Sequence, residues 1–245
     1  MLRNLFGVIA LAVMLGLAGS AVATEDTTKI VFNDTTMDVY YSSYQTPTGG
    51  LVYDPESVLN EVGLSGDDMD PVHSKAYSPG NWNTMATGAL NPYDPANLPR
   101  STTDFPVYFG IDFGLEYELD ELWVWNCNMQ YNHSNRGLQW VYIDYGVDDG
   151  MGGITWTELG EYQFAKATES DAYTHNTTID FGGVIAQYVM ISTRVWDHAT
   201  KPGTYGEATS GLSELRFHGT AIPEPATMLL AGLGAFALLL RRRKR

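Results

Sequence analysis

The central part of the chain alternates hydrophobic and polar residues in short runs. In the clearest run, from Val107 to Phe113, every second residue is a large hydrophobic one. Alternate side chains of a strand share one face, so this run predicts a strand with one buried face. Similar runs predict further strands at Lys29–Phe32, Leu122–Asn126, Trp140–Tyr145, Thr155–Leu159, Thr177–Phe181, Gln187–Thr193 and Glu214–His218. Turn signals separate many of them, at Asp148–Gly153, Gly182–Gly183 and Lys201–Gly203. Short strands divided by turns predict an all-β antiparallel sandwich or barrel.

The segment Thr46–Arg100 follows a different pattern. It holds seven prolines together with many Asn, Asp and Gly residues, which predicts a loop-rich region. Aromatic residues such as Tyr53 and Trp82 need burial, so we expect packed loop with one helical turn near Pro55–Glu61. Loops of this length commonly hold a site or a metal.

Acidic residues dominate the chain, whose formal net charge is −15. The part from 24 to 221 carries 8 basic against 28 acidic residues. A protein that neutralises phosphate needs clustered Lys and Arg, so this balance argues against nucleic acid as a partner. The single cysteine, Cys127, excludes an intrachain disulfide and disfavours a cysteine-ligated zinc.

The N-terminus reads as a secretory signal. Residues 1–23 combine Arg3, an apolar run over Leu5–Leu17 and the small residues Ala21 and Ala23. This order predicts a cleavable signal helix with cleavage after Ala23. The alternative is an uncleaved anchor, although the apolar run is short for a spanning helix.

The C-terminus, residues 222–245, combines three features in a fixed order. Pro223-Glu224-Pro225 precedes the predominantly apolar Ala226–Leu240, and a basic cluster ends the chain. A helix of that length reaches about 22 Å, less than a hydrocarbon core of about 30 Å. The basic end would stay on the cytoplasmic side. The pattern predicts a hydrophobic helix that lodges in the inner membrane during export, and a permanent anchor is the alternative.

This tail resembles a PEP-CTERM sorting signal, with Pro223, Glu224 and Pro225 as its motif. The resemblance implies an exosortase-like processing enzyme as partner. It also implies an exported protein of a Gram-negative-type bacterium, anchored in the inner membrane during sorting and then found at the cell surface or in the extracellular matrix.

A second resemblance covers about Gly63 to Gly219. Its pieces are Val107–Gly114, Leu122–Asn126, Arg136-Gly137, Asp148–Gly150, Trp156-Thr157, Gln187–Val189 and Gly211–Phe217, with Gly63–Gly66, His73 and Trp82 upstream. Their order resembles the discoidin (coagulation factor 5/8 type C) family. The resemblance implies an antiparallel jelly-roll β-sandwich of the galactose-binding-like type as the single domain 24–221.

The same resemblance implies a structural Ca²⁺ between an upstream loop and a glutamate of the last strand. Glu214 is the candidate glutamate, and the loop partners would come from Asp67, Asp68 and Asp70. Calcium takes six to eight oxygen ligands, which carboxylates supply. The alternative is that Glu214 pairs with a base such as Arg216 and that the aspartates are solvated.

Two loops offer residues for binding a sugar, which needs an aromatic plate and planar hydrogen-bonding groups. The candidate residues are Asn128, Tyr131, His133 and Arg136 after one core strand, and Trp196, His198 and Tyr205 before the last strand. In a jelly roll such loops can converge at one end. The alternative is that these side chains pack, form ion pairs or lie at the surface without a ligand.

Signals for an enzyme are thin. The five histidines are scattered without a zinc-binding helix motif, and Gly211–Leu215 only superficially resembles a nucleophile elbow. Cys127 ends an apolar strand, which predicts a buried thiol rather than a nucleophile. We therefore expect a non-catalytic module that binds an extracellular polysaccharide or cell-surface glycan. A structural matrix protein without sugar recognition is the alternative, and a polysaccharide hydrolase is a further one.

Overall fold

A computed structural model describes residues 28–31, 36–42, 58–59, 64–67, 70–73, 82–84, 97–129 and 131–223. The helices predicted at the two ends of the chain lie outside these residues, as do Ala21 and Ala23. Within the described residues, no helix is long and apolar enough to cross a membrane.

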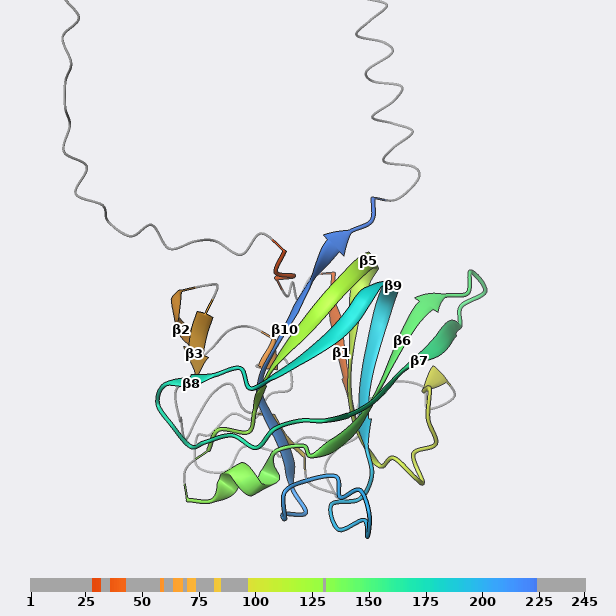
Figure 1. Cartoon of the computed structure of the whole chain (residues 1–245). Helices are drawn as coiled ribbons and strands as arrows, with labels where there is room; N and C mark the ends of the chain where they lie inside the picture. Colours follow the sequence, from red (N-terminus) through yellow and green to blue (C-terminus); the bar gives the residue numbers. More distant parts are fainter. Residues whose placement is uncertain are drawn as a thin grey trace, which may run out of the picture.

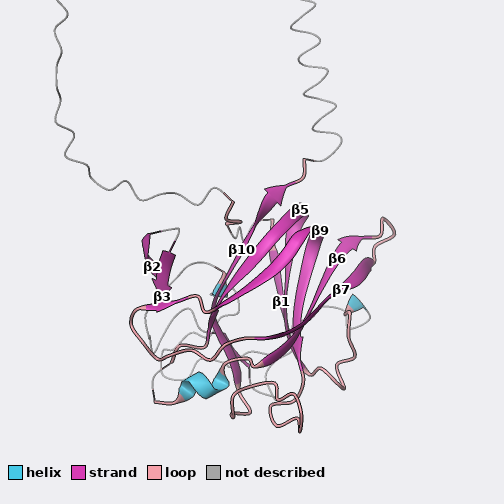
Figure 2. Ribbon diagram, viewed as in Figure 1, coloured by secondary structure: helices cyan, strands magenta, loops and turns pink. Residues whose placement is uncertain are grey.

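The described part contains ten strands and the 3-10 helix η3. Figure 2 shows that strands make up most of it. The strands are β1 (Asp38–Tyr41), β2 (Leu64–Asp67), β3 (Asp70–His73), β4 (Trp82–Thr84), β5 (Val107–Asn126), β6 (Trp140–Asp148), β7 (Ile154–Gln163), β8 (Tyr173–Thr174), β9 (Thr177–Thr193) and β10 (Ser210–Ala221), and η3 is His133–Arg136. Every pairing between these strands is antiparallel. The prediction of an all-β antiparallel fold is confirmed.

The strands form one large sheet and one small one (Figure 1). The large sheet has the order β4-β10-β5-β9-β6-β7, with β1 also paired to β5, and the small sheet is β2-β3-β8. The first part of β5 pairs with β1 and the end of β9, whereas its second part pairs with β10 and the start of β9. The two long strands therefore belong to both halves of the sheet.

Strand β5 changes its pairing partners around Gly114, where its register with β9 shifts between Asp112 and Tyr117. Gly114 has φ 73°, and its N–H donates to the Asp112 carboxylate at 2.7 Å. A Cβ at this position would lie 2.0 Å from the Thr36 carbonyl oxygen, so only glycine fits there.

Side chains from both halves of the sheet meet in one core. Phe109, Ile111 and Phe113 from the first part of β5 share it with Leu122 from the second part. The Phe113 ring packs edge-on against Phe217 of β10, with centroids 5.2 Å apart. The two halves thus face each other as the layers of a sandwich, and burial of the shared apolar face stabilises them.

The predicted strand boundaries need three corrections. The strands predicted at 107–113 and 122–126 are one strand, β5, and those at 177–181 and 187–193 are one strand, β9. In the described residues 29–31 of the predicted strand Lys29–Phe32 no strand forms: Lys29 forms an isolated bridge with His218, and the Ile30 N–H donates to the Phe217 carbonyl. Strand β1 was not predicted, because it is too short to show a clear alternation.

The segment predicted to be loop-rich contains three short strands, β2, β3 and β4. Val58 and Leu59 are buried in the core, and the rest of the predicted helical turn at Pro55–Glu61 lies outside the described residues.

Candidate functional site

Two loops meet at one end of the sandwich. The connection that follows β5 carries η3, and the connection between β9 and β10 runs beside it (Figure 1). Leu138 bridges Thr204, and the Tyr205 N–H donates to the Gly137 carbonyl at 3.3 Å. These bonds hold the two loops against each other, as the sequence analysis expected of loops at one end of a jelly roll.

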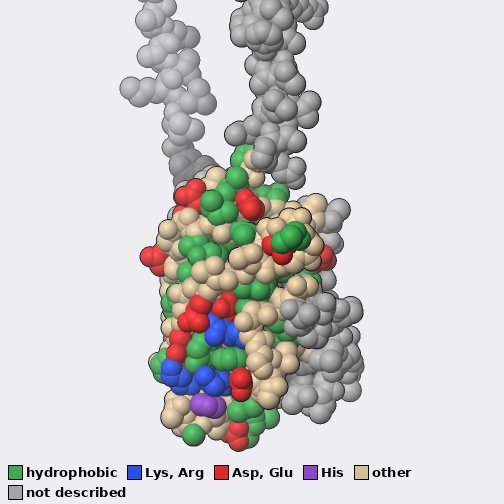
Figure 3. Space-filling view, turned by 90° about the vertical axis from the view of Figure 1, so that its right-hand side faces the viewer, with side chains coloured by type: hydrophobic (Ala, Val, Ile, Leu, Met, Phe, Trp, Pro, Cys, Tyr) green, Lys and Arg blue, Asp and Glu red, His purple; other side chains and the backbone are tan. Residues whose placement is uncertain are grey.

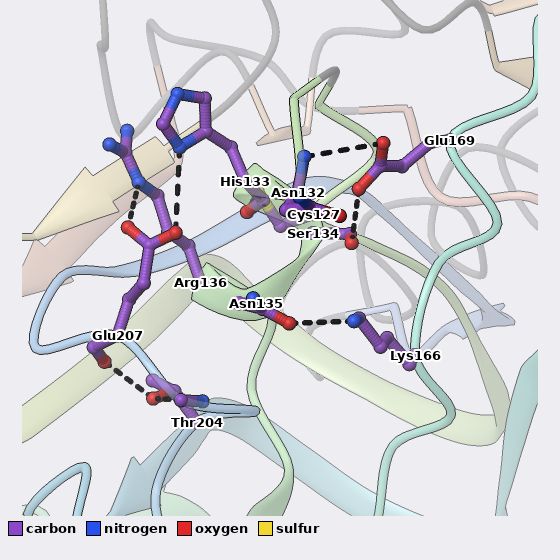
Figure 4. Close-up of polar contacts among 11 residues, drawn as sticks. Cys127, Asn132, His133, Ser134, Asn135, Arg136, Lys166, Glu169, Thr204 and Glu207 are labelled. Atoms are coloured by element: carbon purple, nitrogen blue, oxygen red, sulfur yellow. Dashed lines mark hydrogen bonds and ion pairs between the residues drawn. The ribbon is translucent and has the colours of Figure 1, made fainter.

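Three planar polar side chains gather where the loops touch (Figure 4). Arg136 Nε donates to Glu207 Oε2 at 2.8 Å, and His133 Nδ1 lies 3.4 Å from Glu207 Oε1. The side chains of His133, Arg136 and Glu207 are 29%, 18% and 30% exposed, respectively. We call these residues the His133 cluster. They are fixed in place yet open to solvent.

Buried groups anchor the base of this loop. The Asn126 amide donates to the Leu138 carbonyl at 2.7 Å and to the Ala165 carbonyl at 2.9 Å. Cys127 is completely buried, and its Sγ lies 3.6 Å from the His133 carbonyl oxygen. Burial raises the pKa of the Cys127 thiol to about 12, so it stays protonated. The prediction of a buried thiol is confirmed.

The backbone of this loop is held in a rare conformation. In the described part of the chain, Tyr131, Asn132 and Glu169 are the non-glycine residues with positive φ, at 62°, 63° and 57°. The Glu169 carboxylate accepts from the Ser134 hydroxyl at 2.6 Å and from the Asn132 N–H at 3.4 Å. The Ser134 bond is the main reason that the pKa of Glu169 is lowered. Such backbone conformations persist only where surrounding contacts impose them, and they concentrate at functional sites.

The chemistry of the site suits a neutral polar ligand. Arg136 and Glu207 carry opposite charges at contact distance, so the pair is close to neutral. Tyr131 is 71% exposed and stands two residues before His133. An exposed aromatic ring and fixed planar donors and acceptors are the two kinds of group that a sugar ring contacts, and this loop carries both.

The other residues predicted to bind a ligand lie in different surroundings. Asn128 is completely buried, and its amide donates to the Ser170 carbonyl at 2.8 Å. The Tyr205 hydroxyl donates to the Phe164 carbonyl, and His198 Nδ1 accepts from the Lys201 N–H at 3.3 Å. Asn128 and Tyr205 thus stabilise the fold through hydrogen bonds to backbone carbonyls.

Trp196 is 42% exposed on the connection between β9 and β10. Among the described residues, no hydrogen bond or ring contact joins Trp196 to the His133 cluster. The structure therefore brings together His133 and Arg136 of the predicted set.

The predicted calcium ligands are only partly described. Asp67 and Asp70 are register partners across the β2–β3 hairpin, and their side chains, like Asp68, lie outside the described residues. Glu214 is completely buried on β10 opposite Trp125, and Leu64 of the hairpin packs against the hydrophobic cluster that contains Trp125. Within the described residues, no three His, Cys, Asp or Glu side chains form a metal-binding group.

Sequence analysis missed two residues of the site, Glu207 and Glu169. Neither belongs to a motif or a periodic run, and Glu207 lies 71 residues from Arg136 along the chain. Only the folding of the chain brings them to the loop, so no local signal could have identified them.

The structure and the sequence together define an exported protein with an all-β sandwich domain and a C-terminal sorting signal. Residues 221–244 match the family described as PEP-CTERM protein-sorting motif. This match confirms the predicted sorting signal, which implies export and processing by an exosortase. Pro223 is described in the structure, and Glu224 and Pro225 lie outside the described residues.

Solved structures of two carbohydrate-binding modules and of a chitobiase domain are similar to the chain. One is CBM32-3 from a family 31 glycoside hydrolase of Clostridium perfringens, with 16% identity, a TM-score of 0.44, and 79% of this chain and 96% of that chain covered. Another is the family 32 CBM of C. perfringens NanJ in complex with galactose, with 12% identity, a TM-score of 0.43, and coverages of 78% and 97%. A third is the C-terminal domain of a chitobiase from Bacteroides fragilis, with 16% identity, a TM-score of 0.42, and coverages of 80% and 99%. No curated protein matches the chain in sequence.

Proposed function

We propose that the protein is an exported, non-catalytic carbohydrate-binding module and that the His133 cluster, with Tyr131, forms its sugar site. The observation that carries this proposal is the ion-paired arrangement of His133, Arg136 and Glu207, which is partly exposed at the meeting of two loops. The ligand would be an extracellular polysaccharide or cell-surface glycan, which the protein meets after export.

The arrangement of donors and acceptors supports binding of neighbouring sugar hydroxyls. Arg136 presents the guanidinium nitrogens that Glu207 does not use, and the free oxygen lone pairs of Glu207 accept from a hydroxyl. The exposed Tyr131 ring can cover the apolar face of the sugar.

Preorganisation supports the same proposal. Glu207 fixes both His133 and Arg136, and Glu169 fixes the backbone before them through Ser134. Ordering a flexible side chain on binding costs about 0.5–1.5 kcal/mol, so a site that is already ordered retains more of its contact energy.

Calcium is the second part of the proposal. Glu214 together with aspartates from Asp67, Asp68 and Asp70 would hold the ion and tie the β2–β3 hairpin to β10. Two observations support it: Leu64 packs against the hydrophobic cluster that contains Trp125, the register partner of Glu214, and Glu214 is completely buried. Carboxylate oxygens are the ligands that calcium prefers in proteins, and the four candidate residues would supply them.

A glycan array probed with the full-length protein tests the sugar site. We expect binding to at least one neutral glycan, with Arg136→Ala lowering the affinity at least tenfold because two charge-assisted hydrogen-bonding groups are lost or misplaced. Arg136→Lys keeps the charge but not the planar fork, and should also weaken binding. Met151→Ser, at an 88% exposed position on the β6–β7 turn, is the matched control and should leave binding unchanged.

Circular dichroism of each variant separates loss of binding from loss of fold. If no glycan binds, or if folded Arg136→Ala binds as tightly as the unaltered protein, the proposal is wrong. Tight association with the extracellular matrix in the absence of any glycan binding would instead favour a structural matrix protein.

A further inference from the structure

A second group of basic and aromatic side chains lies away from the His133 cluster, on the outer face of β6 and β9. It consists of Arg100, Phe105, Tyr142, Arg194 and Lys201, and we call it the Arg194 patch. Figure 3 shows basic side chains beside hydrophobic ones low on the molecular face that carries the β6–β7 edge, with acidic side chains around them. Tyr142 belongs to this outer face because its neighbours Val141 and Ile143 point into the core.

The aromatic rings of the patch hold the arginines in place. Phe105 and Tyr142 pack edge to face, with centroids 4.9 Å apart. The Arg194 guanidinium carbon lies 4.9 Å from the Phe105 centroid and 5.5 Å from that of Tyr142, and Arg100 lies over the same two rings. Stacking on aromatic faces fixes a guanidinium while leaving its edge available for hydrogen bonds.

The cations of the patch differ in how their charge is balanced. Arg100 forms hydrogen bonds with Asp144 and Glu158, and Lys201 with Glu161. Within the described residues, the hydrogen-bond acceptor of the Arg194 guanidinium is the neutral Tyr142 hydroxyl, at 3.5 Å from Nε and from one terminal nitrogen. In the described part of the chain, no carboxylate pairs with Arg194, and its other terminal nitrogen has no acceptor.

Lys201 brings a second positive charge close to Arg194. The hydrogen bond that Lys201 donates to Glu161 raises the pKa of Lys201, and the charge of Arg194 acts in the opposite direction. Exposed Val195 and Trp196, 43% and 42% exposed, continue the chain from Arg194 and add apolar surface beside it. A partly exposed guanidinium, a nearby ammonium and an apolar rim together make a site for an oxyanion carried on a larger molecule.

We propose that the Arg194 patch binds the oxyanion groups, carboxylate or sulfate, of an acidic polysaccharide. The polysaccharide part of this inference rests on the proposed carbohydrate-binding function, and the site is distinct from the His133 cluster. The net charge of −15 repels polyanions in general, so binding of an acidic chain must come from a local site and must weaken with salt.

Affinity electrophoresis of the full-length protein in gels with polygalacturonate, dextran sulfate or neutral dextran tests this proposal. We expect retardation by at least one polyanion and none by dextran, and the polyanion that retards identifies the oxyanion. Arg194→Gln should weaken this binding at least tenfold, because hydrogen bonds to charged groups contribute strongly. Arg194→Lys should weaken it less, since it keeps the charge but loses the planar fork.

Two further variants show which site binds the polyanion. Lys166→Gln removes an equivalent charge from an exposed lysine that contacts Asn135, and it should leave polyanion binding unchanged. Arg136→Ala should also leave it unchanged.

The proposal is overturned if neither polyanion binds, if Arg194→Gln binds as tightly as the unaltered protein, or if Lys166→Gln or Arg136→Ala weakens binding as much as Arg194→Gln does. Any of these results would leave neutral glycan binding at the His133 cluster untouched, so the two proposals fail separately.

Discussion

Arg100 connects the loop before β5 to the β6–β7 pair and offers a direct test of how this face is stabilised. Its guanidinium donates to both oxygens of Asp144, at 2.6 Å and 2.9 Å, and to Glu158 at 2.9 Å. The Asp144 side chain is 5% exposed, whereas that of Glu158 is 61% exposed. One arginine thus pairs with a buried and an exposed carboxylate.

The substitution Arg100→Met keeps most of the side-chain volume but leaves Asp144 without its partner. Removing one member of a buried ion pair costs about 3–5 kcal/mol, because the remaining charge stays buried. Losing the contact with the Tyr142 ring adds about 0.5–1 kcal/mol. Glu158→Gln, in contrast, should cost about 0–1 kcal/mol, because an exposed ion pair contributes little.

Urea unfolding followed by tryptophan fluorescence measures both variants. The pH dependence gives an independent check. Burial raises the pKa of Asp144, and the hydrogen bonds from Arg100 oppose this rise. Without Arg100 the pKa of Asp144 in the folded state moves further above its unfolded-state value. The Arg100→Met variant therefore loses stability as the pH rises and regains it as the pH falls.

The difference in the free energy of unfolding between Arg100→Met and the unaltered protein should therefore become smaller as the pH falls from about 7 to about 5. This reasoning is wrong if Arg100→Met is no less stable than Glu158→Gln. It is also wrong if the stability difference between Arg100→Met and the unaltered protein grows as the pH falls.

Three further predictions concern the thiol, the metal and the loop that carries Arg194. Cys127 should resist a thiol reagent at about pH 8 until the protein unfolds, because its buried thiol has a pKa of about 12; rapid labelling of the native protein would contradict its burial. Calcium at a hundredfold excess over Kd should add about 2.7 kcal/mol to the free energy of unfolding and so raise the Tm. A Tm that EDTA leaves unchanged would exclude the proposed ion. Gly203→Ala should cost about 1–3 kcal/mol, because a Cβ would lie 2.1 Å from the Arg194 carbonyl oxygen; an unchanged Tm would contradict this close approach.

The sequence predicted the all-β class because period-two alternation is a local signal. Val107–Phe113 shows it plainly, and its hydrophobic residues do point into the core. The continuation of β5 through Glu116–Glu121 could not be predicted, since this stretch is rich in acidic residues. It remains a strand because it pairs with both β9 and β10.

The site was predictable only in part. The sequence marked His133 and Arg136 as polar residues that follow a core strand, but it could not distinguish them from Asn128, which is buried. Glu207 and Glu169 come from other loops, and they reach the site through long-range folding. Residue type shows what a side chain can do, whereas its burial and its partners depend on the fold.

An NMR titration of the isotope-labelled protein with the strongest glycan from the array tests the central claim most directly. The account predicts that the largest amide shift changes fall on residues 131–137 and 204–207, and that they disappear in Arg136→Ala. Shift changes that centre elsewhere in the chain, with residues 131–137 and 204–207 unaffected, would contradict a sugar site at the His133 cluster.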